Sequence, residues 1–143
     1  MKFYLFSLLL FFSYNVYAQN IPFKIEINNL RNTKGNIVIS VFKDHKSFEA
    51  EIHLVKKEKS KKENMKNTTI ITELSLPPGI YGLVVLDDEN SNNEMDYNLI
   101  GMPKEGYGFS NFYHTNFSKP KFADFSFELT PNTSKMLIRL KYM

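Results

Sequence analysis

The sequence LPPGIYGLVVLDDENSNNEMD, residues 76–96, contains a turn, an apolar strand and an acidic loop in direct succession. The two prolines and Gly79 predict a type II turn, because proline sets φ at its first central position and glycine supplies the positive φ of the second. Residues 80–86 are almost continuously apolar, which is typical of a central strand covered on both faces. The stretch therefore predicts a β-domain that presents an acidic loop from the end of its central strand.

Short strands are predicted on both sides of this stretch. Apolar and polar side chains alternate over residues 21–28, which indicates a strand with one buried face. A turn at residues 32–35, where Gly35 is able to take a positive φ, leads to the β-branched residues 37–42. We expect these two strands to pair, as a hairpin or as the start of a Greek key. Further strands are expected at residues 68–74, 122–129 and 136–140, and residues 43–55 are interpreted as a loop or single helical turn followed by a strand.

The number and length of these segments predict the fold class. Turn signals separate about seven or eight short strands, and the sequence shows no long amphipathic helix and no alternation of strands with helices. We therefore predict an all-β protein, an antiparallel β-sandwich of immunoglobulin or transthyretin type. A single domain is expected over residues 19–143.

Residues 1–18 have the pattern of a secretory signal peptide. Lys2 supplies the positive start, residues 3–12 are almost wholly apolar, and Val16-Tyr17-Ala18 is a small-residue cleavage signal. The apolar stretch is too short for a membrane span, so none is expected in the mature chain. Cleavage after Ala18 removes Lys2 and lowers the formal charge from +3 to +2.

The amino-acid composition limits where the protein is expected to be located and which kinds of partner it is expected to bind. The chain has no cysteine, which excludes a disulfide scaffold and thiol catalysis, and together with export it favours a bacterial periplasmic, secreted or cell-surface protein. The charge is too small to indicate nucleic-acid binding. The only basic run, residues 56–62, is interpreted as a solvated loop or edge. A cell-envelope protein or a glycan is the expected kind of partner.

The acidic loop has the alternating oxygen spacing of a calcium loop. In an EF-type loop, calcium takes side-chain oxygens at positions 1, 3 and 5, a carbonyl at position 7 and a contact at position 9. The corresponding residues are Asp88, Asn90, Asn92, Glu94 (through its carbonyl) and Asp96. Asn93 replaces the usual glycine and Leu99 replaces the bidentate glutamate, so the expected site is weak, with a Kd of about 10⁻⁴ to 10⁻³ M. The alternative is that these residues only cap the backbone of a turn.

No catalytic constellation is evident in the sequence, and we expect no catalytic residues. The three histidines are scattered, and the segment Gly106–Asn111 lacks the last glycine of a dinucleotide fingerprint. A non-enzymatic module is therefore the leading hypothesis. The alternative is an enzyme or enzyme accessory in which the acidic loop and the KEGYG segment converge on one pocket, with a site built from Asp87, Asp88, Lys104, Glu105 and Tyr107.

The segment after the acidic loop is rich in glycine and aromatic residues. Such a segment suits a stacking platform for a sugar or an exposed patch for a protein partner. The candidate ligand- or partner-binding residues are Lys104, Glu105, Tyr107, Phe109, Phe112 and Tyr113. The alternative is that the aromatic rings fold over the open end of the sandwich as part of its core.

Four stretches together resemble the DUF2141 family of uncharacterised exported bacterial proteins. They are LRNxxG at residues 30–35, LPPGIY at 76–81, DENxN at 88–92 with Asp96, and GMPKEGYGFSN at 101–111. The last of these is quite specific, and the four cover nearly the whole mature chain. The chain departs from the family pattern at Asn93, where glycine is usual, and at the bulky Phe112-Tyr113-His114. The resemblance implies an exported β-sandwich and implies no particular reaction.

Overall fold

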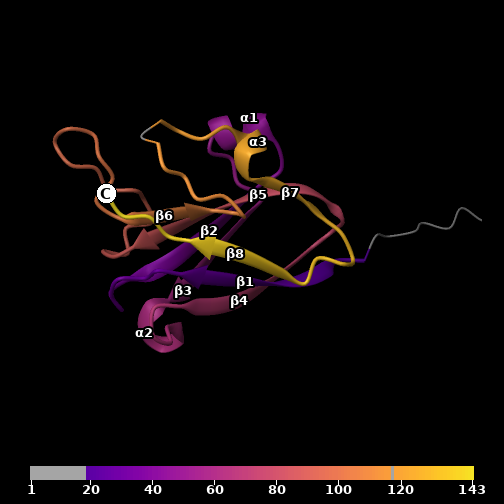
Figure 1. Ribbon diagram of the computed structural model, residues 1–143, viewed down its shortest axis with the longest axis horizontal. Helices are drawn as coiled ribbons and strands as arrows, with labels where there is room; N and C mark the ends of the chain where they lie inside the picture. Colours follow the sequence, from indigo (N-terminus) through magenta and orange to yellow (C-terminus); the bar gives the residue numbers. More distant parts are fainter. Residues whose placement is uncertain (1–18, 117) are drawn as a thin grey trace, which may run out of the picture.

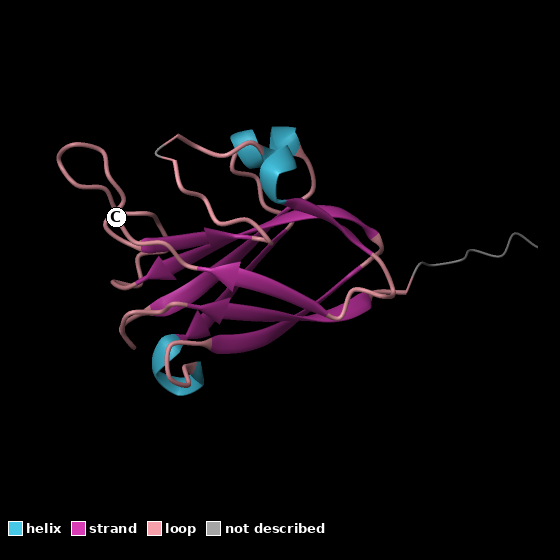
Figure 2. Cartoon of the chain, viewed as in Figure 1, coloured by secondary structure: helices cyan, strands magenta, loops and turns pink. Residues whose placement is uncertain are grey.

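Two packed β-sheets form the body of the protein. The computed structural model describes residues 19–116 and 118–143, so the predicted signal peptide lies outside the described residues. The described residues form eight strands, which confirms the all-β sandwich (Figures 1 and 2). One sheet has the order β4–β1–β8, and the other has the order β3–β2–β5–β6 with β7 also paired to β5. The strands are β1 (Ile21–Asn28), β2 (Asn36–Phe42), β3 (Val55–Ser60), β4 (Ile70–Leu76), β5 (Gly79–Asp88), β6 (Gly106–Phe109), β7 (Ser126–Leu129) and β8 (Lys135–Arg139).

Strand β5 lies at the centre of the larger sheet, as the apolar run predicts. It pairs antiparallel with β2, β6 and β7, and the side chains of Tyr81, Leu83 and Val85 face the core between the sheets. Ile80 is the exception to the predicted burial, because 58% of it is exposed near the start of the strand. The predicted type II turn is wrong in one respect: Gly79 does not have a positive φ and instead begins β5.

The predicted pairing of β1 with β2 is wrong. β1 pairs antiparallel with β4 and parallel with β8, with Ile25 opposite Thr72 and Met136, whereas β2 lies in the other sheet between β3 and β5. The residues between them carry the chain from one sheet to the other, and Gly35 has the expected positive φ of 66°. Alternation of polarity predicts which face of a strand is buried and carries no information about its neighbours.

The predicted strand over residues 122–129 begins with a helical turn. Residues Phe122–Phe125 form helix α3, and only Ser126–Leu129 form a strand. The Asp124 side chain accepts a hydrogen bond from the backbone N–H of Lys121 at 2.8 Å, which closes the turn. Phe122 and Phe125 are three residues apart, so the helical turn directs both rings to the same face.

The helical turn expected within residues 43–55 is helix α1 (His45–Glu49), but the strand expected at the end of this range starts later, because β3 begins only at Val55. Asp44 caps α1 through a 2.7 Å hydrogen bond from the N–H of Ser47. The basic run is in part an edge strand, as expected, because β3 pairs only with β2. It is not wholly solvated, however: the run continues into helix α2 (Lys61–Asn64), and Lys61 is completely buried.

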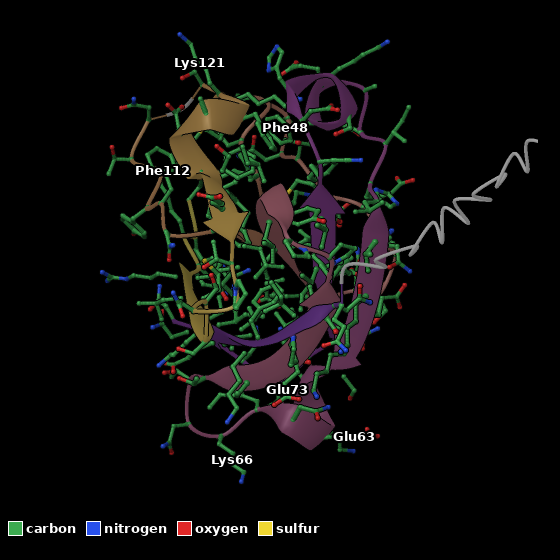
Figure 3. The ribbon with its side chains drawn as sticks, turned by 90° about the vertical axis from the view of Figure 1, so that its right-hand side faces the viewer. Phe48, Glu63, Lys66, Glu73, Phe112 and Lys121 are labelled. Atoms are coloured by element: carbon green, nitrogen blue, oxygen red, sulfur yellow. The ribbon has the colours of Figure 1, made fainter. Side chains whose placement is uncertain are left out.

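Two apolar clusters hold these elements together. The larger fills the space between the sheets and includes Ile25, Ile39 and Leu83, all fully buried. The smaller is aromatic and lies on the outer face of the larger sheet, under α1 and α3, where the ring centroids of Phe48 and Phe125 are 5.0 Å apart. Figure 3 shows Phe48 beneath α1, with the charged Glu63 and Lys66 at the opposite end of the molecule. Within the described residues, no helix is long and apolar enough to cross a membrane.

Candidate functional site

The acidic loop leaves the end of β5 and is closed by the side chain of Asp88. This carboxylate is fully buried and accepts hydrogen bonds from the backbone N–H groups of Asn92, at 3.1 Å, and Asn93, at 2.9 Å. Asn93 has a φ of 66°, the left-handed conformation that asparagine tolerates better than most residues. The loop therefore folds back on its first residue, and Asn93 performs the conformational role of the usual glycine.

The remaining predicted calcium ligands are gathered around Asp96. One oxygen of Asp96 accepts a hydrogen bond from the Asn90 side-chain amide at 2.6 Å, and the other accepts one from Asn92 at 3.3 Å. The amide oxygen of Asn92 in turn accepts the backbone N–H of Glu94 at 2.9 Å. The side chains predicted from their spacing thus lie together. Leu99, at the position of the missing glutamate, is fully exposed.

Glu105 supports the acidic loop from the segment before β6. Its carboxylate accepts hydrogen bonds from the backbone N–H of Glu89 at 2.9 Å and of Asp96 at 3.3 Å, and only 4% of the residue is exposed. Burial raises the pKa of the Glu105 carboxyl, and the negative charges of Asp88 and Asp96 raise it further, although the two N–H donors oppose the change. The acidic loop and the KEGYG segment therefore contact each other.

The turn after β1 holds the outer side of the acidic loop. The guanidinium of Arg31 donates hydrogen bonds to both carboxylate oxygens of Glu89, at 2.6 and 3.0 Å, and one to the backbone carbonyl of Lys104 at 3.0 Å. Asn32 donates a further hydrogen bond to Glu89 at 2.9 Å. These contacts hold the pKa of Glu89 below its ordinary value. One contact network thus joins three motifs that are far apart in the sequence: LRNxxG, DENxN and PKEGYG.

A buried ion pair lies beneath this network. Lys61 of α2 and Asp87 of β5 are both completely buried and form a salt bridge. The Lys61 ammonium also donates to the side-chain oxygen of Asn32 at 3.1 Å, and the hydroxyl of Tyr142 donates to the second oxygen of Asp87. Burial raises the pKa of Asp87, whereas Lys61 and Tyr142 oppose this change. The pair closes the end of the sandwich next to the acidic loop.

The Gly/aromatic segment does not act as one surface. Tyr107 and Phe109 lie on β6 and face the outer side of the sheet, and Phe112 packs on Phe109 with ring centroids 6.4 Å apart. Tyr113 is 44% exposed, and the guanidinium carbon of Arg139 lies 4.9 Å from its ring centroid. Lys104 is exposed. The segment thus combines rings that cover the aromatic cluster with the partly exposed ring of Tyr113.

A groove of about 640 Å³ lies on the outer face of the larger sheet. Its floor comes from β2 and β5, and its walls come from the acidic loop on one side and the residues after β6 on the other. The floor includes Val38, Ser40, Val84 and Leu86. A volume of this size suits a small organic molecule, since such pockets measure roughly 300–1,000 Å³.

The residues of the enzyme alternative do not share this groove. Of its five members only Tyr107 is part of the groove lining. The carboxyl groups of Asp87, Asp88 and Glu105 are buried and accept hydrogen bonds from neighbouring protein groups. In residues 19–116 and 118–143, no group of three or more His, Cys, Asp and Glu side chains has the arrangement of a metal site. A calcium loop of the predicted kind would use two carboxylates with amide and carbonyl oxygens.

A family model described as an uncharacterized protein conserved in bacteria matches residues 25–136. The chain belongs to this family, DUF2141. The resemblance drawn from the four sequence stretches is thereby confirmed. No curated protein and no solved structure matches the chain.

Several residues of this DUF2141 site were not predicted from the sequence. Lys61 lay within a run of solvated charges, and Tyr142 lay at the end of the last strand without a motif of its own. One signal was available: alternation along β5 places Asp87 on the same face as Leu83 and Val85, so this carboxylate required a buried cationic or hydrogen-bonding partner. His114, which lines the groove, also carried no signal in its spacing.

Proposed function

We propose that this DUF2141 protein is an exported module of the periplasm or cell surface that acts by binding, not by catalysis, and whose acidic loop holds a calcium ion. The observation that carries the proposal is the gathering of Asp88, Asn90, Asn92 and Asp96 by mutual and backbone hydrogen bonds. The side chains of these four residues supply hard oxygen atoms, which calcium prefers.

The supporting contacts also favour a cation at this place. Asp88, Asp96 and Glu105 bring three carboxylates into electrostatic contact, and their mutual repulsion contributes to the raised pKa of Glu105. A divalent cation removes this repulsion. Only two of these carboxylates occupy predicted ligand positions, so the affinity is that of a weak extracellular calcium module, with a Kd of about 10⁻⁴ to 10⁻³ M. In this role calcium fixes the loop that forms one wall of the groove.

Calcium is expected to raise the melting temperature of the protein. A ligand that binds only the folded state stabilises it by about 1.4 kcal/mol at ten times its Kd, which corresponds to a rise of about 5 °C for a domain of this size. Thermal melts in excess calcium and then in chelator measure the shift. The Asp88→Ala/Asp96→Ala double variant should show none. Glu94→Gln is the matched control and should keep the full shift, because residue 94 contributes its backbone carbonyl. An equal melting temperature in calcium and chelator would refute the calcium part of the proposal.

The calcium-induced shift is expected to grow with pH between about 4 and 7. The pKa of Glu105 is raised in the folded state, so the folded apo-protein holds this proton more tightly than the unfolded chain does. At low pH the bound proton thus stabilises the folded protein without calcium relative to the calcium-bound protein. This stabilisation disappears as the pH rises through the folded-state pKa of Glu105. Calcium competes with the proton and gains affinity over the same range. Melts with and without calcium across this range measure the effect, and the Glu105→Gln variant should flatten it. A shift that is equal at both ends of the range in the unmodified protein would contradict this electrostatic coupling.

A further inference from the structure

Two adjacent aliphatic side chains stand at the tip of the loop between β5 and β6. Leu99 and Ile100 have relative exposures of 107% and 83%, the highest among the large hydrophobic residues that the structure describes. They belong to residues 97–103, a segment without a charged side chain that we call the finger; Asp96 precedes it and Lys104 follows it. Figure 1 shows the chain between β5 and β6 extending beyond the ends of the strands. The most exposed apolar side chains thus lie on a projecting, uncharged tip.

The finger pairs its backbone donors within itself. The side-chain oxygen of Asn98 accepts hydrogen bonds from the backbone N–H groups of Ile100 at 3.0 Å and Met102 at 2.9 Å. The backbone N–H of Asn98 donates to the carbonyl of Met102 at 2.9 Å, and its carbonyl accepts from the N–H of Gly101 at 3.0 Å. An unpaired N–H is costly in an apolar medium, so segments that enter lipid pair these groups internally. The tip of the finger already meets this requirement at these residues.

The finger is long enough to carry its tip below lipid headgroups. At its base the N–H of Lys104 donates to the carbonyl of Asp96 at 2.8 Å, and Tyr97 pairs with Pro103. Leu99 follows Asp96 by three residues, which at about 3.3 Å per residue places the tip about 10 Å from the base. Segments in a lipid interface bury their apolar side chains to a depth of about 5–10 Å. Tyr97, 58% exposed, then lies near the headgroups, where amphipathic rings are common.

A lipid surface fits this tip better than a protein partner does. A stable protein interface takes about 20–30 residues from each side, whereas the finger offers two exposed aliphatic residues and one tyrosine. Loops and strand edges that bind proteins also gain from free backbone groups, and the donors named above are already paired. The exposed Ile71 and Leu137 differ from the tip: they flank Glu26 on the outer face of the smaller sheet, and Glu26 forms a salt bridge with Lys135.

We propose that the finger binds the protein reversibly to a lipid surface, with Leu99 and Ile100 inserted at the boundary between the headgroups and the acyl chains. This rests on the proposed role of an exported binding module and names its partner. It does not require calcium, because the hydrogen bonds that shape the tip come from the finger itself. Asp96 and Lys104 bring opposite charges to the base, so a lipid without net charge is the appropriate probe.

The first test is NMR on the ¹⁵N-labelled protein, purified from the exported fraction, with phosphatidylcholine bicelles. Part of the lipid carries a nitroxide near the top of an acyl chain, which broadens the amide signals of residues close to it. The signals of residues 98–102 should lose most of their intensity. Those of residues 76–79 should keep it, because the finger follows the far end of β5. Titration with bicelles gives the apparent affinity for lipid.

Variants assign the binding to the tip. Leu99→Ser/Ile100→Ser should lower the apparent affinity at least roughly tenfold, because the burial of two aliphatic side chains is lost. Ile71→Ser/Leu137→Ser is the matched control: it removes the same two residue types at positions 57% and 46% exposed, and should leave the affinity unchanged. The sequence has no tryptophan, so Ile100→Trp places a single indole at the tip. Its fluorescence should move to shorter wavelength on phosphatidylcholine vesicles, whereas that of Ile71→Trp should not.

Three results would overturn the proposal. The first is the absence of both broadening and an indole shift, which would leave the tip to a protein partner. The second is broadening confined to residues 19–22, which would show attachment through the other end of the molecule. The third is equal affinity of Leu99→Ser/Ile100→Ser and the unmodified protein.

Each experiment is performed in calcium and in chelator. Failure of the calcium proposal then appears as residues 88–96 that do not respond to calcium while residues 98–102 are still broadened by the lipid. Failure of the lipid proposal appears as residues 98–102 that keep their intensity while calcium still shifts residues 88–96.

Discussion

Replacing Lys61 by methionine is expected to lower the free energy of unfolding by about 3–5 kcal/mol at neutral pH. The change keeps an apolar side chain of similar length but leaves the Asp87 carboxylate buried without its cationic partner. The Tyr142 hydroxyl remains and neutralises none of the charge. Urea unfolding at neutral pH measures the loss. Lys62→Met is the matched control: Lys62 is the exposed neighbour in the same helix, and its replacement should cost about 0.5 kcal/mol or less.

The loss in Lys61→Met should shrink as the pH is lowered. Burial already raises the pKa of Asp87 in the unmodified protein, and loss of the ammonium raises it further. The folded variant therefore binds a proton more tightly than its unfolded chain. The penalty is present in full above the folded-state pKa of Asp87 and disappears below its unfolded-state value of about 4. Asp87→Asn added to Lys61→Met removes the charge, keeps an acceptor for Tyr142 and should restore part of the stability at neutral pH. A loss below about 1 kcal/mol, or one that is equal at pH 7 and pH 4, would contradict the assigned role of the ion pair.

Gly35→Ala is expected to have the second large effect, on both stability and calcium binding. Gly35 has a φ of 66°, and a Cβ atom there would lie 2.0 Å from the carbonyl oxygen of Asp88 and 2.7 Å from the carbonyl carbon of Glu89. Both atoms are backbone, so the turn and the start of the acidic loop must separate. We expect a loss of about 3 kcal/mol, from the left-handed conformation and from the displaced contacts. The calcium-induced rise in melting temperature should fall with it.

Gly101→Ala separates conformational strain from close packing. Gly101 also has a positive φ, of 77°, but a Cβ atom there would meet nothing within 4 Å. This variant should lose only about 1–2 kcal/mol and keep the full calcium response. Equal losses in the two variants, measured by chemical unfolding, would show that the contact of Gly35 with the acidic loop is unimportant.

The sequence was sufficient to predict most of the strands, although not β6, but not how they are arranged. The alternation over residues 21–28 predicts that Ile25 and Ile27 are buried, and both are. The same alternation is satisfied by any neighbouring strand, so it could not show that β1 pairs in parallel with β8. Residues 122–125 illustrate a second limit. Phe125, Phe127 and Leu129 suit a strand, but Phe122 and Phe125 equally suit one helical turn, and packing on the aromatic cluster favours the turn.

The candidate site was predictable where its geometry is local. Spacing alone placed Asp88, Asn90, Asn92 and Asp96 together, since the loop closes on itself within a few residues. The contacts that hold this loop, and the ion pair beneath it, come from distant residues such as Arg31, Glu105 and Lys61, and they depend on the sheet order. Lys61 is the clearest case. Within the run KKEKSKK nothing distinguishes it from its exposed neighbours, and its burial beside Asp87 depends on the tertiary fold.

We propose above that the acidic loop, held in place by the residues around it, is a calcium site. The most direct test is a calcium titration of the uniformly ¹⁵N-labelled protein, followed through its backbone amide resonances. We expect saturable shifts confined to residues 88–96 and to the neighbours of Glu105, with a Kd of about 10⁻⁴ to 10⁻³ M, and no such shifts in the Asp88→Ala/Asp96→Ala variant. Resonances of residues 88–96 that do not move at several millimolar calcium, or shifts scattered over the surface, would contradict it.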